Sequence, residues 1–279
     1  MKCYIYSENM KILHCIFLTI FLINTKTIVL SDDKTLVEAV NSDKRTAKYV
    51  LRDQYRNPLE TLSFFGLRND MKVIELQPSG GNSPGGWYTE ILAPFLKKNG
   101  LLIAAHFDPR ESDWRAKMRN DYEKRIKSEK DFNKIKMSVL SMPPKKLTDE
   151  NSVDMVLTFR NLHNWLKSGY LKEVFQVSYN ALKKGGIFGV VEHRAPESFS
   201  ISQMNSSGYV TESLAIKIAQ EVGFVLIDKS EINSNDKDTK IHPKGVWTLL
   251  PTLKLGEKNK EKYLEIGESD RMTLKFTKP

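Results

Sequence analysis

Cysteine is scarce in this chain. Its only two cysteines, Cys3 and Cys15, lie within residues 1–30. If that segment is removed, the remainder contains no thiol, which excludes a disulfide framework and a thiolate metal site. The later histidines do not have the spacing of metal ligands either. They are His106, His163, His193 and His242. We therefore expect no metal site.

Two nucleotide-binding signatures are also missing. The chain contains neither the nicotinamide fingerprint G-x-G-x-x-G nor the phosphate-binding loop G-x-x-x-x-G-K-[ST]. The missing fingerprint argues against an NAD-dependent oxidoreductase, which stays as the weakest alternative. The missing loop argues against a nucleoside triphosphatase of the phosphate-loop type.

The chain carries an excess of positive charge, but its basic residues are not concentrated in one segment. The formal net charge is +9, yet residues 117–136 read KMRNDYEKRIKSEKDFNKIK, with acids among the bases. Such mixing is typical of a solvated helix face rather than a nucleic-acid surface. We expect a small-molecule substrate and no nucleic-acid partner; the oligomeric state is not indicated.

The first thirty residues differ in character from the rest. Lys2 and Lys11 precede the apolar run ILHCIFLTIFLI at Ile12–Ile23. A spanning helix needs about 20 apolar residues, so this shorter run suits a signal peptide. We predict a leader over residues 1–30, cut somewhere in 24–31, and export to the periplasm or medium without a membrane anchor. A start at Met10 is an alternative, and so is a buried N-terminal strand or helix.

The remaining 249 residues predict one α/β domain at 67–279 preceded by a helical segment at 31–66. In that segment we expect one helix at 43–56 and a second at 57–66. Asn57 would cap the second helix, Pro58 would occupy its first position and Gly66 would end it.

Beyond residue 67, apolar runs alternate with helical patterns. Uniformly apolar strands that are each followed by a helix are buried on both faces, which predicts a doubly wound, mostly parallel sheet. We expect Asp270 and Arg271 to contact each other at the edge of this sheet. The predicted strands are 72–76, 101–107, 136–140, 153–159, 187–192, 224–232 and 272–277, and the predicted helices 87–98, 112–127, 170–182 and 211–222.

A glycine cluster joins the first strand to the first helix of this domain. It consists of Gly80, Gly81, Gly85 and Gly86. Glycine lets a ligand approach the backbone, and the following helix N-terminus favours an anion. Asp108 follows the second strand, where a carboxylate can accept both hydroxyls of a ribose. The pattern predicts a nucleoside-cofactor site; the alternatives are a flexible turn and an ordinary strand terminator.

These stretches resemble a known family. VIELQPSGG…GGWYTEIL is similar to motif I of class I S-adenosylmethionine-dependent methyltransferases, in which an acid, here Glu75, ends the first strand. LKKGGIFGVVEHRAP resembles that family's fifth-strand region. More narrowly, GGWYTEIL, FRNLHNW, EHRAP and GESDRMTLKF resemble a group of exported bacterial proteins described as predicted methyltransferases. The resemblance covers residues 56–279.

The resemblance implies a Rossmann-like sheet of about seven strands whose last strand is antiparallel, with S-adenosylmethionine over the first two strand ends. Glu75 and the glycine cluster would shape the loop around the methionine half, and Asp108 would hold the ribose. The chain departs from the group by inserting residues around 82–84 and by offering only Ser141 where a polar residue often meets the adenine.

The stretch FRNLHNW, residues 159–165, follows the fourth predicted strand. Methyl transfer is an in-line displacement, and a hydroxyl or amine acceptor must also lose a proton. His163 has a suitable side chain for that base, with His193 as a rival. Arg160 could pair with a carboxylate of the substrate or of the methionine moiety, and Asn161 could shape the pocket. The alternative is a structural histidine in a polar strand end.

The sequence thus predicts an enzyme that transfers a methyl group from S-adenosylmethionine to an unidentified small acceptor. The alternative is a non-catalytic exported binding protein that keeps the fold and the pocket. The leader favours this alternative, because S-adenosylmethionine is a cytoplasmic metabolite by general expectation.

Overall fold

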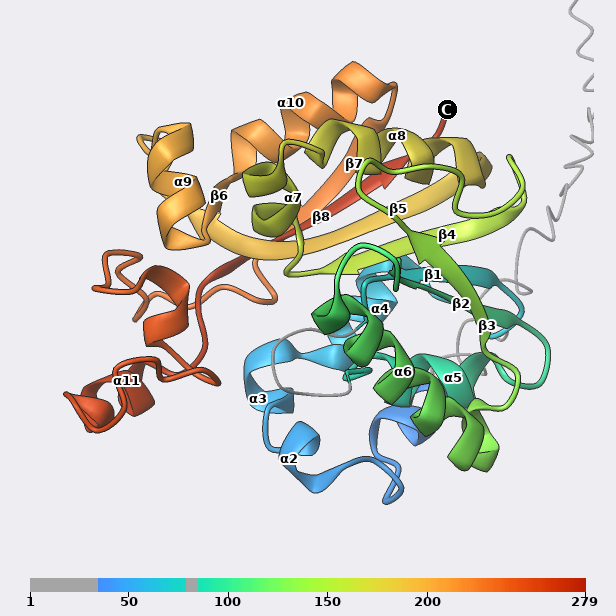
Figure 1. Cartoon of the computed structure of the whole chain (residues 1–279), viewed down its shortest axis with the longest axis horizontal. Coiled ribbons are helices and arrows are strands. Elements are labelled where there is room, and N and C mark those ends of the chain that lie inside the picture. Colours follow the sequence, from blue (N-terminus) through green and yellow to red (C-terminus); the bar gives the residue numbers. More distant parts are fainter. Residues whose placement is uncertain (1–34, 79–84) are drawn as a thin grey trace, which may run out of the picture.

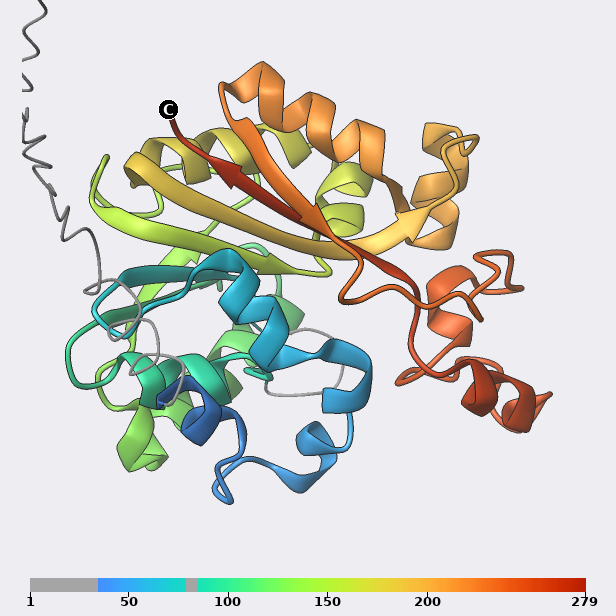
Figure 2. The same ribbon diagram turned by 180° about the vertical axis from the view of Figure 1, so that it is seen from behind.

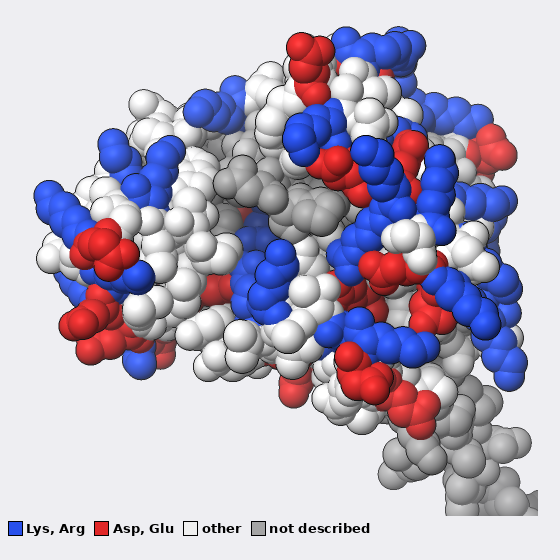
Figure 3. Space-filling model, turned by 60° about the horizontal axis from the view of Figure 1, so that its bottom comes forward, with Lys and Arg blue, Asp and Glu red and all other residues white. Residues whose placement is uncertain are grey.

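The computed structural model describes residues 35–78 and 85–279 of the chain (Figure 1). The predicted leader and the glycines Gly80 and Gly81 lie outside these residues. Within the described ranges, every helix is too short or too polar to span a bilayer. On the face shown in Figure 3, acidic and basic side chains are interspersed, as residues 117–136 predict.

An eight-stranded sheet forms the centre of the molecule. Its main path runs in the order β3-β2-β1-β4-β5-β8-β7, and β6 pairs with β5 off that path. The pairs from β3 to β5 are parallel, whereas β8 is antiparallel to both of its neighbours. This confirms the predicted mostly parallel sheet with an antiparallel last strand. The strands are β1 (Lys72–Leu76), β2 (Leu101–Phe107), β3 (Lys136–Leu140), β4 (Val153–Phe159), β5 (Leu182–Ala195), β6 (Val210–Thr211), β7 (Val225–Ser230) and β8 (Arg271–Thr277).

Helices cover both faces of the sheet (Figures 1 and 2). One face carries α4 (Pro58–Phe65), α5 (Thr89–Leu96) and α6 (Asp113–Ser128), and the other carries α7 (Leu162–Ser168), α8 (Leu171–Ala181) and α10 (Glu212–Val222). Val73 packs into the first core and Ile74 into the second, because neighbouring strand residues point to opposite faces. Each fully buried aliphatic side chain contributes about 1.5–3 kcal/mol.

The N-terminal segment differs from its prediction. The expected helix 43–56 is two short helices, α2 (Ala47–Val50) and α3 (Asp53–Arg56). Arg45 forms a forked ion pair with Asp53 at 2.6 and 2.8 Å. A continuous helix would separate these residues by about 12 Å along its axis, so the pair requires the chain to fold back.

The second predicted helix, α4, is present, but its cap is not the expected one. Pro58 occupies the first position, and Gly66 ends the helix in the left-handed region at φ 78°. Asn57, however, donates its side-chain amide to the carbonyl oxygen of Ile232 at 2.6 Å and makes no capping bond. The tertiary contact thus replaces the predicted local one.

Strand β5 is longer than predicted. Gly185 and Gly186, which lie between the predicted helix 170–182 and the predicted strand 187–192, belong to β5 and exchange backbone hydrogen bonds with Lys278. Pairing with the end of the chain therefore extends the strand. Several short elements carried too few residues for a readable period and were not predicted. They are α7, β6, α9 (Ile201–Ser207), α11 (Lys260–Ile266), η1 (Lys130–Phe132) and η2 (Gly245–Thr248).

The segment between β7 and β8 is irregular but packed. Asp238 is buried at its centre and accepts hydrogen bonds from the hydroxyl of Tyr209 and the backbone of Asp270. The expected contact between Asp270 and Arg271 is wrong. Asp270 pairs with Arg194 at 2.9 Å, whereas Arg271 pairs with Glu268, because adjacent residues at the start of a strand face opposite sides.

Candidate functional site

The carboxyl ends of β1 and β4 form the topological switch point of the sheet. The chain leaves β1 towards β2 and β3, and leaves β4 towards β5, on the other side. Ligands of doubly wound sheets bind in the crevice outside such a point. Here the two strand ends are tied together, since the side-chain amide of Asn161 donates to the carbonyl oxygen of Leu76 at 3.0 Å.

Gln77, the residue after β1, makes a second connection between the segments that follow β1 and β4. It has a left-handed backbone at φ 44°, an uncommon conformation for a residue other than glycine. Its side-chain oxygen accepts the indole N–H of Trp165 at 2.9 Å. Arg160, one residue past β4, is also left-handed, at φ 61°. Strained backbone of this kind occurs where surrounding structure enforces it, often at functional sites.

Glu75 is the last residue but one of β1. Its buried carboxyl group accepts a hydrogen bond from the hydroxyl of Thr89 at 2.6 Å, and that hydroxyl lies 3.1 Å from the hydroxyl of Tyr122. Burial raises the pKa of Glu75 to about 7, and the bond from Thr89 lowers it only partly. Glu75 therefore anchors the start of α5, which follows the loop.

The described part of the cluster, Gly85 and Gly86, has left-handed backbone at φ 87° and 83°. A Cβ at Gly86 would lie 3.0 Å from the side chain of Thr89, so this position fits only glycine without movement. The carbonyl oxygen of Gly85 accepts from Arg125 at 2.8 Å. These contacts hold the end of the loop against the helices; its role towards a cofactor stays a prediction.

Asp108 directly follows β2, as predicted, and is held by Arg110. The guanidinium donates to both carboxylate oxygens at 2.9 and 2.6 Å. These bonds, with one from the Arg110 backbone, lower the pKa of Asp108 well below its usual range. The side chain of Arg110 is 81% exposed, so it can move away without leaving a buried charge. A ligand diol can therefore replace it at the carboxylate.

His163 lies in the first turn of α7 and is paired with Glu192 of β5. Its Nδ1 lies 3.0 Å from a carboxylate oxygen of Glu192. Glu192 is fully buried and also accepts the backbone N–H groups of Leu162, His163 and His193. A carboxylate in this position accepts a hydrogen bond from Nδ1–H and leaves Nε2 as the atom that can take up a proton. Reasoning from the sequence did not identify this pairing.

His193 is a weaker candidate for a base. Burial lowers its pKa well below the usual range, and positive charge at His163, Arg271 and Arg160 adds to this effect. Its Nδ1 contacts the hydroxyl of Ser269. Ligand atoms of His163, Glu192 and His193 lie within 4.8 Å of one another, which is close enough for a metal ion. The arginine charges that disfavour a protonated His193 also oppose a divalent cation there.

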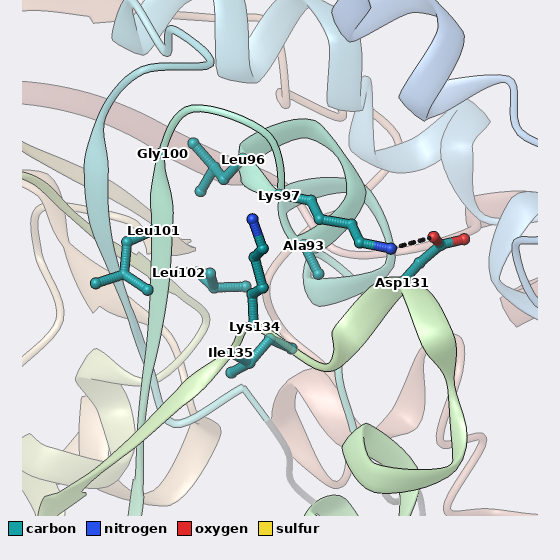
Figure 4. A pocket seen from close by; sticks show the side chains of 9 residues that line it. All are labelled: Ala93, Leu96, Lys97, Gly100, Leu101, Leu102, Asp131, Lys134 and Ile135. Carbon is teal, nitrogen blue, oxygen red and sulfur yellow. Dashed lines mark hydrogen bonds and ion pairs between the residues drawn. The ribbon is translucent and has the colours of Figure 1, made fainter.

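A hollow lies at the other end of the parallel strands from the switch point, where β2 begins (Figure 4). It is lined by the last turn of α5 and by residues 134–135, and an ion pair between Lys97 and Asp131 at 3.0 Å closes one side. Its remaining walls are mostly aliphatic, and it is remote from the carboxyl ends of the strands. We do not place the site there.

The sequence between β1 and α5 contains a further pattern, which the predictions above do not include. Residues 81–85 read G-x-S-x-G, the pattern of a hydrolase nucleophile elbow, which requires a strand before it and a helix after it. β1 and α5 flank the pattern. Ser83 itself lies outside the described residues, so this stays an observation on the sequence.

No protein-family model and no curated protein sequence matches the chain. Solved structures do. The structure of the [4+2]-cyclase SpnF matches with a TM-score of 0.55 at 12% identity, over 91% of this chain and 95% of that one. A candidate sarcosine dimethylglycine methyltransferase from Galdieria sulphuraria matches at 0.52 and 13%, over 89% and 98%.

A third similar structure is the geranyl diphosphate C-methyltransferase from Streptomyces coelicolor A3(2), solved with Mg²⁺, geranyl diphosphate and S-adenosyl-L-homocysteine. Its TM-score is 0.52 at 12% identity, over 87% of this chain and 86% of that one. At these identities the likenesses establish the fold. This confirms the predicted fold class, and the presence of a cyclase among the three shows that the fold alone does not fix the reaction.

Proposed function

We propose that this protein transfers a methyl group from S-adenosylmethionine to a small-molecule acceptor. The observation that supports this most directly is the position of Asp108 at the end of β2, beside the switch point of a sheet that methyltransferases share. Its carboxylate is ionised, and its one side-chain partner among the described residues is the exposed guanidinium of Arg110. Its two acceptor oxygens fit the hydroxyls of the ribose of a nucleoside cofactor.

The cofactor supplies an activated methyl group when it is bound. The chain's own residues would bind and orient the reactants. Asp108 would hold the ribose hydroxyls, and Gly85 and Gly86 would keep the end of the loop close to the strand. Gln77 and Asn161 would hold the ends of β1 and β4 at a fixed separation, since both are joined across the crevice. Such alignment is the main requirement of an in-line displacement.

Proton removal would fall to His163. Glu192 fixes the ring through Nδ1, so that Nε2 is available to take the proton of an acceptor hydroxyl or amine. Asn161, whose amide is already bonded to Leu76 and Thr158, would position the loop rather than contact the reacting atoms. Arg160 would face an anionic part of a ligand.

A second function, a non-catalytic exported binding protein, is favoured by two observations. The apolar segment Ile12–Ile23 suits export, and Arg110 occupies the carboxylate of Asp108. An NAD-dependent oxidoreductase would use Asp108 equally well but lacks the glycine fingerprint.

Calorimetry separates the three functions. The purified chain is titrated with S-adenosylmethionine, S-adenosylhomocysteine and NAD in parallel. We expect micromolar-range binding of the first two and none of NAD. Binding of NAD alone would identify an oxidoreductase-type site, and silence with all three would leave the binding-protein function.

Export is a separate proposal and needs its own experiment. The full chain is produced in a bacterial host, and the protein in the periplasmic fraction is sequenced from its N-terminus. A start within residues 24–32 would support the leader. A protein retained in the cytoplasm with Met1 or Met10 as its first residue would refute it.

A further inference from the structure

The strongest unexplained feature beside the proposed site is a group of three arginines, two of them buried and one partly exposed. Arg56 of α3 and Arg271 of β8 are 3% and 2% exposed, and both line a narrow cavity with Arg160. The stacked rings of Tyr88 and Phe159, 3.5 Å apart between centroids, form part of its wall. We call Arg56, Arg160 and Arg271 the arginine cluster.

The described carboxylates beside this cluster, Glu268 and Glu192, are fewer than the guanidiniums, which number four when Arg52 is included. Glu268 pairs with Arg52 at 2.5 Å, with Arg56 at 3.2 Å and with Arg271. One carboxylate thus faces several guanidiniums, which lower its pKa well below the usual range. Burial and mutual repulsion in turn lower the pKa of Arg160 to about 10 and that of Arg56 well below its usual value. Uncompensated buried charge is costly unless a partner arrives.

Some hydrogen-bond donors of the arginine cluster also have no partner among the described residues. Nη2 of Arg56 and Nε of Arg271 are buried without a partner among the described residues. The guanidinium of Arg160 makes no hydrogen bond or ion pair within the same part of the chain. Arg56 is partly compensated by the ring of Trp87, whose centroid lies 4.7 Å away. Buried donors without partners are rare in native proteins, so these donors are available to a ligand that supplies acceptors.

Asn233 on the cavity wall adds to this set. Its amide nitrogen donates to the hydroxyls of Thr61 and Thr273, both at 2.9 Å, while its oxygen is buried without a partner. A reversed amide would accept from Thr273 and place its N–H₂ where the unpartnered oxygen now lies, at the expense of the bond that Thr61 donates to the carbonyl oxygen of Arg56 at 3.2 Å. An acceptor ligand would select that orientation.

We propose that the arginine cluster is a subsite for a doubly charged oxyanion, the phosphate group of the methyl acceptor. Planar guanidiniums bind such groups through paired N–H donors, and four guanidiniums, Arg52 included, against the two carboxylates Glu268 and Glu192 favour two negative charges over one. The subsite lies beside the proposed base, because His193 pairs with Arg271 across β5 and β8 and its ring lies 5.4 Å from that of His163. The acceptor would thus be a small phosphorylated molecule.

The assignment to the acceptor rests on the proposed function, but anion binding itself does not. The cavity lies on the β5 and β8 side of β4, whereas Asp108 lies beyond β1 on the opposite side. The methionine carboxylate of the cofactor is the competing occupant, and the experiment has to distinguish the two.

The test is calorimetry of the full chain with inorganic phosphate, pyrophosphate and acetate, each with and without saturating S-adenosylhomocysteine. We expect phosphate or pyrophosphate to bind at least tenfold more tightly than acetate. Addition of S-adenosylhomocysteine should not change the affinity for either anion. Acetate as the preferred anion would overturn the phosphate class. Loss of phosphate binding on adding S-adenosylhomocysteine would assign the cluster to the cofactor instead.

Variants locate the site. Arg160→Gln should weaken phosphate binding at least tenfold and Arg160→Lys less, because lysine keeps the charge but loses the fork. The control Arg68→Gln removes an exposed guanidinium before β1, at the opposite end of the strands, and should change nothing. Equal phosphate binding by Arg160→Gln and the parent chain would overturn the proposal. Failure of S-adenosylhomocysteine to bind, with phosphate binding intact, would instead refute the proposed function.

Discussion

The indole N–H of Trp165 donates to the side-chain oxygen of Gln77 at 2.9 Å, and so joins the first helix after β4 to the residue after β1. Trp165 is 1% exposed and Gln77 is 8% exposed. The bond crosses the switch point and is shielded from water, so it connects the segments that follow β1 and β4.

Trp165→Phe should therefore destabilise the protein and loosen the crevice. It leaves the buried oxygen of Gln77 without its donor, which costs about 1–3 kcal/mol. Urea unfolding measures the loss, and calorimetry should show weaker S-adenosylmethionine binding as well. Trp114→Phe is the matched control, because Trp114 is 49% exposed. If both variants unfold at the same urea concentration as the parent, the bond makes no measurable contribution to the free energy of unfolding.

Asp108→Asn should weaken S-adenosylmethionine binding at least tenfold, since the amide loses the two charged acceptors that a ribose diol needs. Arg110→Gln should bind at least as tightly as the parent, because it removes the residue that occupies the carboxylate. Calorimetry of both variants checks the pair. Tighter binding by Asp108→Asn than by Arg110→Gln would contradict the assignment of the ribose site.

His163→Gln should lower turnover by about 10²–10⁴-fold, the usual contribution of a general base. Cofactor binding should stay within twofold, because His163 lies beyond β4 rather than over β1 and β2. Initial rates with the identified acceptor and calorimetry with S-adenosylhomocysteine measure the two effects. His242→Gln is the control, a histidine bonded to Asp238 away from the crevice. Unchanged turnover would remove His163 from the mechanism.

Glu75 should make stability depend on pH. Its folded pKa of about 7 lies above the ordinary 4.5, so between these values the folded state keeps a proton that the unfolded state has lost. The free energy of unfolding contributed by Glu75 is therefore full below about pH 4.5, falls by about 1.4 kcal/mol per unit, and is lost above about pH 7. Glu75→Gln should abolish this decline and be the more stable form at about pH 8.

Urea unfolding of parent and Glu75→Gln across this range measures the difference directly. Glu173→Gln, a change at an exposed position on α8, is the control and should follow the parent at every pH. A parent chain that gains stability relative to Glu75→Gln as the pH rises would show that Glu75 is ionised in the folded protein.

Gly86→Ala should be more harmful than Gly185→Ala. Both glycines are left-handed, at φ 83° and 76°, which costs an alanine about 1–2 kcal/mol. A Cβ at Gly86 also meets Thr89 at 3.0 Å, whereas one at Gly185 meets nothing within 4 Å. Thermal unfolding separates strain from overpacking. Equal melting temperatures for the two variants would mean that the end of the glycine loop shifts to accommodate the Cβ at residue 86 without a further loss of stability.

Regular elements with a full apolar period were predictable from the sequence. β1 to β4 lie where the apolar runs predict them, and α6 begins at the Ser112 cap and buries Met118, Tyr122 and Ile126. Trp114, in the first turn of this helix, is half-exposed. Local propensity and burial agree in these elements, so the sequence carries the information within short windows.

The chemistry of the site was less accessible, because it depends on contacts distant in sequence. Residue types at strand ends identified His163 and Arg160, but the pairing of His163 with Glu192 spans 29 residues. The arginine cluster joins an N-terminal helix to the last strand, and no local pattern links Arg56 to Arg271. Sheet topology, not spacing, brings these groups together.

The position of β8 has a consequence for how the polypeptide is made. β7 reaches the sheet only through β8, and β8 is formed by residues 271–277. While those residues are still inside the ribosome, β7 has no neighbour to join and one side of β5 is bare. Until residues 271–277 have emerged, the polypeptide cannot complete this side of its sheet, and loss of those residues would remove β8 and leave β7 without its pairing partner among the described strands.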